Sequence, residues 1–200
     1  MKTRLVIVNI ERNSELLSSP ERFSSRGRIL RCSRMKSEEK RRQAFAAELA
    51  LSYALSGETL LPPAYGYDAN GRPFAEGCFI SISHTNGHAA CAWSEAPVGV
   101  DIEEPRHVSP RLASRILSPE ERAAGLAARE GALLCAFVAK EAYLKLTGEG
   151  LFGGMDRLTA ADGRILKNGE TAAFLYNADC EGCICRLASS EPTSPEIIVL

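Results

Sequence analysis

The feature that most limits how this chain can fold is a repeated order of helical and strand signals. A long helical pattern over residues 37–55 is followed by strand-like segments. A second helical pattern over residues 131–147 is again followed by strand-like segments. Helices and strands segregated in this way favour an α+β fold over an alternating βαβ array. We therefore expect a pseudo-twofold duplicate of two similar α+β lobes, residues 1–100 and 101–200, with a ligand cleft between them.

Local signals mark the ends of the first long helix. Ser37 suits the N-cap position, and Gly57 suits the C′ position just after the last turn. Phe45, Leu49 and Tyr53 recur at i, i+4 and i+8 and so share one helical face. Two further helices are predicted over 19–31 and 109–130, with a second N-cap at Ser118 inside the latter. Strands are predicted over 3–10, 64–67, 78–83, 88–93, 98–102, 158–159, 171–176 and 183–187. Turns are predicted over 68–71 and 162–163, and the last ten residues are predicted to be a loose end or an edge strand.

Charge and hydropathy exclude several classes of protein. A formal net charge of -1 argues against a general nucleic-acid binder. Residues 22–42 nevertheless carry nine lysines and arginines against two glutamates, which predicts a local anion-attracting surface. No apolar run approaches the roughly 20 residues of a membrane span, and the N-terminal run is too short for a signal peptide. We therefore expect a cytoplasmic protein with neither a membrane nor a nucleic-acid partner.

The cysteines are odd in number and scattered. Seven cysteines in a protein expected in the cytoplasm predict reduced thiols and no structural disulfide. Cys180, Cys183 and Cys185 have C-x2-C-x-C spacing, but no fourth ligand lies near, so buried or edge-strand thiols are the better interpretation. His84 and His88 have H-x3-H spacing, but the Asn-Gly turn between them breaks the helix that such a zinc site needs.

Two short stretches carry the acids that bear on function. Asp101 and Glu103 lie at i and i+2, on one side of a predicted strand, and Glu141 and Lys145 lie at i and i+4 on one helical face. Taken separately, the pair of acids is typical of a solvated strand end, and the Glu-Lys pair is typical of a surface helix. Apolar neighbours of Glu141 and Lys145 indicate a mostly buried helix instead. If the two elements meet, three carboxylates and a lysine form a site for Mg²⁺, or possible Mn²⁺, and a phosphate ester.

Other polar residues fit a phosphate ligand. Ser83 and His84 stand at a strand end, where a hydroxyl and an imidazole can donate to phosphate, although a structural histidine is the simpler interpretation of His84 alone. Arg72 lies in a Gly-Arg-Pro turn, which alone predicts a turn and nothing more. The sequence contains neither of the glycine-rich phosphate-binding motifs, G-x-x-x-x-G-K-[ST] and G-x-G-x-x-G, and it has no G-x-S-x-G nucleophile elbow. A conventional nucleotide kinase, a dehydrogenase and an α/β-hydrolase are therefore excluded.

Taken in order, four motifs resemble the 4′-phosphopantetheinyl transferase superfamily. They are G-R-P at 71–73, S-x-S-H at 81–84, G-V-D-I-E at 99–103 and F-x-x-K-E-A-x-x-K at 137–145. The resemblance covers about residues 28–152 and is to the larger, two-lobed type that activates peptide and polyketide synthases. It implies a pseudo-twofold pair of α+β lobes with coenzyme A between them. One departure is Phe137, which stands where the family usually has tryptophan.

The resemblance also implies a role for each matching residue. Asp101, Glu103 and Glu141 would hold Mg²⁺ on the coenzyme A diphosphate, and Lys145 would meet the transferred phosphate. The residues implied in coenzyme A binding are Ser83 and His84 for the phosphate groups, Arg72 for the adenosine end, and Arg28 and Arg31 for the 3′-phosphate.

The implied activity is transfer of the 4′-phosphopantetheine group from coenzyme A to a serine of an acyl or peptidyl carrier protein. The by-product is 3′,5′-adenosine bisphosphate. Glu141 is the expected base, with Glu120 or Glu121 as alternatives, and Arg111 and Arg115 would meet an acidic carrier. Two active-site halves in one chain favour a monomer. The competing hypotheses are a catalytically silent relative that binds carrier protein or coenzyme A, and a magnesium-dependent phosphoesterase.

Overall fold

The structure is a computed structural model that describes residues 1–69, 71–150 and 154–200. Asn70, in the turn predicted over 68–71, lies outside the described residues, as do residues 151–152 at the end of the stretch that carries the resemblance.

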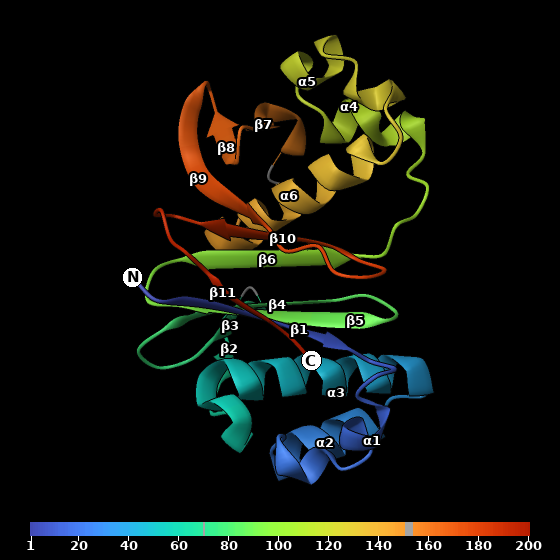
Figure 1. Ribbon diagram of the computed structural model, residues 1–200, viewed down its shortest axis with the longest axis vertical. Helices are drawn as coiled ribbons and strands as arrows, with labels where there is room; N and C mark the ends of the chain where they lie inside the picture. Colours follow the sequence, from blue (N-terminus) through green and yellow to red (C-terminus); the bar gives the residue numbers. More distant parts are fainter. Residues whose placement is uncertain (70, 151–153) are drawn as a thin grey trace.

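Two β-sheets pack face to face, and each is covered on its outer face by one long helix (Figure 1). The first sheet has the strand order β11-β1-β5-β4 and is covered by α3, and the second has the order β6-β10-β9-β8-β7 and is covered by α6. A small hairpin of β2 and β3 forms a separate two-stranded sheet next to β4. Helices and strands are thus segregated within each layer, which confirms the predicted α+β class.

The strands are β1 Thr3–Asn9, β2 Gly66–Tyr67, β3 Pro73–Phe74, β4 Phe79–His84, β5 His88–Ser94, β6 Val98–Glu103, β7 Leu158–Ala161, β8 Arg164–Lys167, β9 Glu170–Asn177, β10 Ile184–Ser189 and β11 Glu196–Val199. The α-helices are α1 Ser14–Leu17, α2 Arg26–Ser33, α3 Glu38–Ser56, α4 Ala113–Ile116, α5 Pro119–Ala123 and α6 Ala132–Thr147. Short 3₁₀ turns are η1 Pro20–Arg22, η2 Gly57–Thr59, η3 Pro110–Leu112, η4 Leu126–Ala128 and η5 Met155–Arg157.

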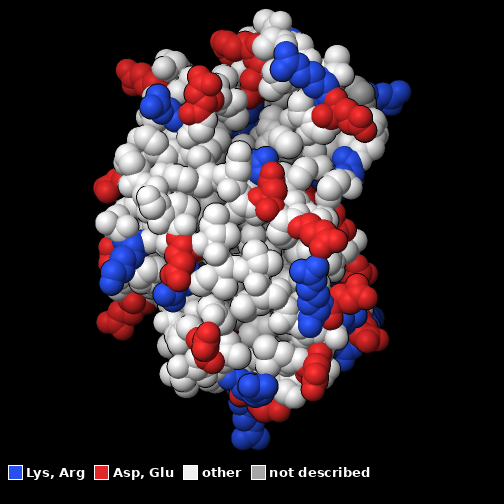
Figure 2. Space-filling model, in the orientation of Figure 1, with Lys and Arg blue, Asp and Glu red and all other residues white. Residues whose placement is uncertain are grey.

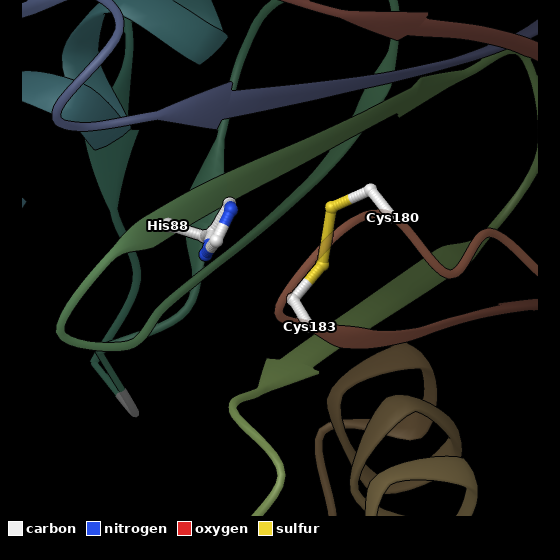
Figure 3. A group of neighbouring side chains, drawn as sticks. All are labelled: His88, Cys180 and Cys183. Carbon is white, nitrogen blue, oxygen red and sulfur yellow. A yellow bond between two sulfur atoms is a disulfide. The ribbon is translucent and has the colours of Figure 1, made fainter.

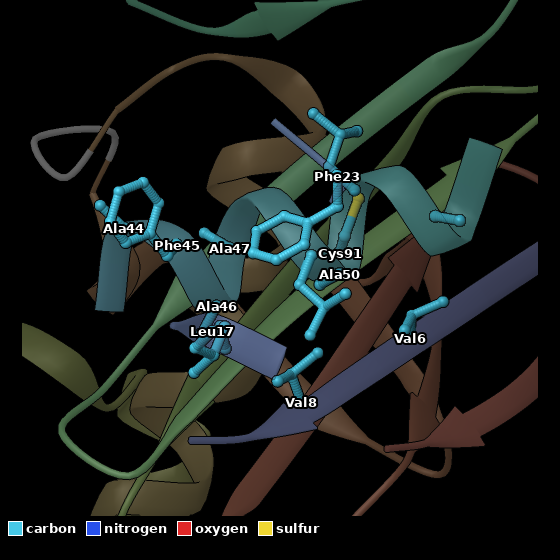
Figure 4. Packing of buried hydrophobic residues seen from close by; sticks show 14 of the residues in the cluster. Val6, Val8, Leu17, Phe23, Ala44, Phe45, Ala46, Ala47, Ala50 and Cys91 are labelled. Atoms are coloured by element: carbon cyan, nitrogen blue, oxygen red, sulfur yellow. The ribbon is translucent and has the colours of Figure 1, made fainter. Parts of the chain in front are cut away.

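The long helices begin and end where the sequence predicts. The Ser37 side chain accepts a hydrogen bond from the Lys40 backbone N–H, and Gly57 follows α3 with a φ of 62°. Phe45 and Leu49 are buried, as their shared face predicts. Figure 4 shows α3 packing with side chains of β1 and with Phe23, which together form the core of the first layer.

Two predicted helices are wrong in extent, and one strand escapes the sequence pattern. The helix over 19–31 divides into η1 and α2, because the chain turns to bury Phe23 and restarts at the Ser25 N-cap. The helix over 109–130 divides into four short segments. Ser118 is extended before Pro119, which disfavours helical backbone there, and then caps α5 through a capping box. β8 forms across the predicted turn at 162–163.

The two sheets share an apolar interface. Leu5 and Ile7 of β1 are fully buried in one cluster with Val100 of β6 and Leu187 of β10. β6 begins at Val98, before residue 100, yet belongs to the second sheet. β11 returns to pair in parallel with β1 at an edge of the first sheet, so the last ten residues contain the edge strand that was one of the two predictions for them. The division into lobes at residue 100 stays a prediction, because the chain crosses between sheets on both sides of it.

The expectation that all cysteines are reduced is wrong for Cys180 and Cys183, which form a disulfide. The reason is local: Cys183 N–H donates to the Cys180 carbonyl across a tight turn in which Gly182 has a φ of 76°. This turn brings the two Cα atoms to 5.4 Å, inside the range that a disulfide spans. Cys185 remains a buried free thiol, as predicted.

Candidate active site

The candidate active site lies where α6 packs on β6. A Cβ added to Gly99 of β6 would lie 2.0 Å from the Ala142 carbonyl oxygen and 2.5 Å from the Leu146 nitrogen of α6. Only glycine permits so close an approach of a strand to a helix backbone. The contact brings the acids of β6 next to Glu141 and Lys145 of α6.

Asp101 stands at the centre of this site and is 5% exposed. Its Oδ1 accepts hydrogen bonds from Ser83 Oγ at 2.8 Å and from Lys145 Nζ at 2.7 Å. Lys145 Nζ also donates to Ser83 Oγ at 2.8 Å. The structure therefore joins three predicted site residues, from β4, β6 and α6, in one hydrogen-bonded triad.

Glu141 lies one helical turn before Lys145 and is also buried. Burial raises the pKa of its carboxyl to about 7. The negative charges of Asp101 and Glu103 act in the same direction, and Lys145 opposes them. Glu141 Oε1 and Asp101 Oδ2 are both buried and have no hydrogen-bond partner among the described residues.

These two unpaired oxygens test whether the residues present fit a metal. Buried polar atoms are nearly always paired, because an unpaired one loses its hydration without compensation. A hard divalent cation prefers carboxylate oxygens and would satisfy both atoms at once. The donor set therefore fits Mg²⁺.

Glu103 has its ion-pair partner outside this group of acids. It is partly exposed and forms an ion pair with Arg106, 3.3 Å away. Within the part of the chain that the structure describes, the oxygens of Asp101, Glu103 and Glu141 do not form a group all within 4.8 Å of one another. Glu103 therefore stays a predicted ligand that would turn from Arg106 toward the metal.

A cavity of about 350 Å³ opens beside the triad. Arg72, Ser81, Glu141 and Lys145 contribute to its lining, so Arg72 is brought to the predicted acids. Arg72 Nη2 donates to the Leu146 carbonyl at 2.6 Å, near the C-terminal end of α6, where the helix dipole favours a cation. His84 is exposed at the end of β4. Partial burial of its ring and the charge of Lys145 lower the pKa of His84.

The structure places Arg28 and Arg31 in a different cavity, of about 290 Å³. Tyr65 and Tyr67 line it with them. Arg28 Nε donates to Oε1 of the buried Glu48 at 2.8 Å. The β2–β3 hairpin connects the two cavities, because Tyr67 in this one pairs with Pro73 in the cavity of Arg72.

Sequence reasoning missed two residues that organise the site. Glu48 accepts hydrogen bonds from both Arg28 and the Tyr65 hydroxyl. The signal in the sequence was a carboxylate within the apolar stretch of the first long helix.

Lys140 is the second of these residues. It is fully buried and donates to Glu121 and to the Ile116 carbonyl. Glu121 also accepts from the backbone N–H groups of Ser118 and Ala160, so this candidate base is directed away from the cavity.

Residues 97–181 match a family model described as the 4′-phosphopantetheinyl transferase superfamily. The 4′-phosphopantetheinyl transferase psf-1 of Bacillus pumilus is 28% identical over 147 residues, which make up 70% of this chain. The chain spans 60% of the length of that relative.

Among solved structures, the chain is similar to the crystal structure of Thermotoga maritima holo-[acyl-carrier-protein] synthase. The match covers 49% of this chain and 64% of that one, at 23% identity and a TM-score of 0.37. This score is too low to establish a shared fold.

The family match contains Asp101, Glu103, Glu141 and Lys145, and therefore two of the four motifs that carry the resemblance. The recognition made from those motifs is confirmed. Residues 97–181, which contain the acids and the lysine of the candidate active site, are thus similar to the 4′-phosphopantetheinyl transferase superfamily.

Proposed function

We propose that the protein transfers the 4′-phosphopantetheine group of coenzyme A to a serine of an acyl or peptidyl carrier protein and releases 3′,5′-adenosine bisphosphate. The observation that carries the proposal is the cavity in which Arg72, Glu141 and Lys145 meet, beside two unpaired buried carboxylate oxygens. Two cations and Glu141 line one cavity, next to the buried Asp101, and together they suit a diphosphate ester with its metal ion.

Asp101 and Glu141 would hold Mg²⁺, and Glu103 would complete the set. An ion held there would neutralise diphosphate charge and help to align the reacting groups. Mn²⁺ has similar preferences for oxygen ligands and is the alternative metal.

The chain's own residues supply the remaining chemistry. The serine hydroxyl attacks the β-phosphorus, and Lys145, fixed by Asp101 and Ser83, offers its positive charge to the phosphate being transferred. His84 lies beside it at the strand end and donates to a phosphate oxygen. Glu141, in its ionised form, is the proposed base that takes the serine proton.

Two cavities would receive the two charged parts of coenzyme A. The diphosphate would lie in the cavity of Arg72 and Lys145, and the 3′-phosphate of the adenosine end in that of Arg28 and Arg31. The β2–β3 hairpin between them would lie under the intervening part of the ligand. Tyr65 and Tyr67, whose rings meet edge to face, offer an aromatic surface to the adenine.

A third cavity, of about 590 Å³, suits the carrier protein. Val108 and Leu133 give it an apolar lining, and Arg106 and Arg129 stand in it as cations that an acidic carrier would meet. Arg106 pairs with Glu103, which places this surface next to the predicted metal ligands. Arg111 and Arg115, on the neighbouring η3 and α4, would extend it.

The partners and location belong to the same proposal. Residues of β4, in the first sheet, and of α6, which covers the second sheet, line the diphosphate cavity, so one copy of the chain suffices and a monomer is proposed. None of the helices in the described residues is long and apolar enough to cross a membrane. On the face seen in Figure 2, lysine and arginine are interspersed with aspartate and glutamate and form no continuous basic surface of the kind that nucleic acid needs. We propose a cytoplasmic enzyme, in line with its five free cysteines.

The experiment is incubation of the protein with coenzyme A, Mg²⁺ and an apo carrier protein. Mass spectrometry of the carrier then reports the gain of one phosphopantetheine group. Glu103→Gln and Lys145→Met should each lower the rate by about 10²–10³-fold, the usual cost of losing one group that stabilises a transition state. The matched controls are Glu181→Gln, which changes an exposed residue, and Lys167→Met, which changes a partly exposed one; both lie outside the cavity and should leave the rate unchanged.

Three results would contradict the proposal. Coenzyme A binding without a mass gain on any carrier would indicate a catalytically silent relative. Breakdown of coenzyme A without a carrier would indicate a phosphoesterase. Full activity of Lys145→Met would remove the lysine from the mechanism.

A further inference from the structure

Away from the candidate active site, the structure gathers a histidine and two cysteines from distant parts of the chain. One ligand-capable atom each of His88, Cys180 and Cys183 lies within 4.8 Å of the others. His88 begins β5 of the first sheet, and the cysteines lie in the turn between β9 and β10 of the second. Figure 3 shows the disulfide facing the imidazole ring. None of the three belongs to the acid cluster or its cavity.

The two sulfur atoms differ in access. Cys183 is 4% exposed, whereas Cys180 is partly exposed. A thiol from solution can therefore reach the Cys180 sulfur and not that of Cys183. A hydrogen bond from Cys183 N–H to the Cys180 carbonyl, at 3.0 Å, also holds the turn between them.

The hydrogen bonds of Asn9 define which nitrogen of His88 carries the proton. Asn9 Oδ1 accepts from the backbone N–H groups of Glu11 and Arg12, at 3.0 Å each, so its Nδ2 must be the group that donates to His88 Nε2 at 3.2 Å. An imidazole that accepts at Nε2 carries its proton on Nδ1. That Nδ1 is buried and has no partner among the described residues.

The charged groups around the site leave this neutral form in place. Burial lowers the pKa of His88, Glu104 opposes that shift, and Arg12 supports it. Arg12 itself pairs with Glu181 at 2.7 Å. On the other side of the turn, Asp179 accepts from the Cys185 N–H and from Arg186. The His88 ring is thus a neutral donor beside two sulfurs, with no acceptor of its own in the disulfide form.

We propose that Cys180 and Cys183 are a redox-active pair that exchanges with external thiols, and that His88 is the positioning residue that donates a hydrogen bond to the Cys180 thiolate when the pair is reduced. A thiolate from solution attacks Cys180 Sγ, the S–S bond breaks, and its electron pair goes to Cys183 Sγ. A second external thiol then displaces Cys180. Overall, two external thiols become one disulfide, and their two protons and two electrons end on the two cysteines.

The same hydrogen bonds argue against zinc at this position. A metal needs an unprotonated ring nitrogen, but Nδ1 carries the proton and the Nε2 lone pair faces the Asn9 amide. In metal sites the second ring nitrogen normally donates to an oxygen, and here it faces another donor. Thiolate stabilisation is the use of His88 that the surrounding contacts support.

The test equilibrates the full chain in buffers of reduced and oxidised dithiothreitol and alkylates the free thiols for mass spectrometry. We expect one reversible two-electron transition confined to Cys180 and Cys183. In the reduced protein at pH 7, iodoacetamide should modify Cys180 about tenfold faster than the partly exposed Cys135, because the hydrogen bond from His88 stabilises the thiolate, which is the form that reacts. His88→Ala should remove most of this difference.

Because the main measurements use the unaltered protein, the proposal does not depend on the folding of a variant. A disulfide that does not exchange in the folded protein would overturn it, as would equal alkylation rates of Cys180 and Cys135. Uptake of one equivalent of Zn²⁺ by the reduced protein, measured with a chromophoric chelator, would also overturn it in favour of a metal site. Cys135→Ser is the matched control and should leave the transition unchanged.

Discussion

At the scale of single residues, the packing of α6 on β6 raises the pKa of the Glu141 carboxyl. Its carboxyl is buried beside two other acids, and only Lys145 offsets them. The folded protein therefore holds a proton on Glu141 at pH values where an unfolded chain has released it. This difference links the acid cluster to stability.

Glu141 should make the metal-free protein less stable as the pH rises. Its pKa is about 7 in the folded protein against 4.5 for the unperturbed group, so below pH 4.5 both states are protonated and the site costs nothing. The cost grows as the pH rises to about 7 and then levels off, at about 3 kcal/mol of unfolding free energy. Urea unfolding of the protein and of Glu141→Gln at several pH values measures it. A pH-independent difference between the two proteins would contradict the expectation.

Mg²⁺ should reverse that cost. At pH 8 Glu141 is ionised and can bind the ion, so added Mg²⁺ should raise the melting temperature, whereas at pH 5.5 protonated Glu141 should reduce the effect. Differential scanning fluorimetry at matched ionic strength measures both, with Glu141→Gln as the control that should lose the response. A similar shift in the variant would show that the ion binds elsewhere.

The residue scale also shows what spacing can predict. Asp101 and Lys145 meet as predicted, because strand and helix periods decide which side chains share a face. Spacing says nothing about the rotamer of Glu103, which turns to Arg106. Nor does it show that Arg28 is held by Glu48, a contact between two different helices.

At the scale of elements, the approach of α6 to β6 depends on one glycine. Gly99→Ala would place a methyl group 2.0 Å from the Ala142 carbonyl, so the helix or the strand must shift. We expect a loss of about 1–3 kcal/mol or more of unfolding free energy, as for other overpacked cores. Urea midpoints measure it.

Gly27→Ala is the matched control for that change. It lies in α2 with nothing within 4 Å of an added Cβ, so alanine should be neutral or stabilise by up to about 1 kcal/mol. Equal stability losses in the two variants would contradict the packing argument.

A buried ion pair ties α6 to α5. Lys140 is fully buried and donates to Glu121 and to a backbone carbonyl. Glu121→Gln would leave a buried ammonium without its counter-charge, so we expect a loss of about 3–5 kcal/mol. Lys140→Met combined with Glu121→Gln should lose less than the sum of the two single changes, because no unpaired charge remains. A double-mutant cycle by urea unfolding measures the coupling, and strict additivity would contradict it.

At the scale of the whole molecule, the two sheets share one apolar interface and should unfold together. Leu187, in β10 of the second sheet, is fully buried in the cluster that also contains Leu5 and Ile7 of the first. Trp93, the single tryptophan of the sequence, lies in β5 of the first sheet. Fluorescence of Trp93 therefore reports on the layer opposite to Leu187.

Leu187→Ala should lower the urea midpoint seen by Trp93 fluorescence and by far-UV circular dichroism equally. The expected loss is about 2–5 kcal/mol, as for other large-to-small changes in a core. One shared transition would show that the sheets form one cooperative unit. A Trp93 transition that stays at its original midpoint would instead show that the lobes unfold separately.

The sequence by itself determined the α+β class, the two long helices with their caps, and the four motifs of the resemblance. These features are local: hydrophobic period, capping residues and i to i+2 or i to i+4 spacing act within a few residues of the chain. For the same reason, Ser118 was recognised as an N-cap although the helices on either side of it are short.

Only the tertiary structure decided which groups from distant segments face one another. It brought Ser83, Asp101 and Lys145 into one triad and separated the cavity of Arg28 from that of Arg72. It also paired Cys180 with Cys183 beside His88, where composition predicted reduced thiols. The physical reason is the packing of two sheets and two helices, which decides burial, charge environment and side-chain direction together, and none of these is a property of a short stretch of sequence.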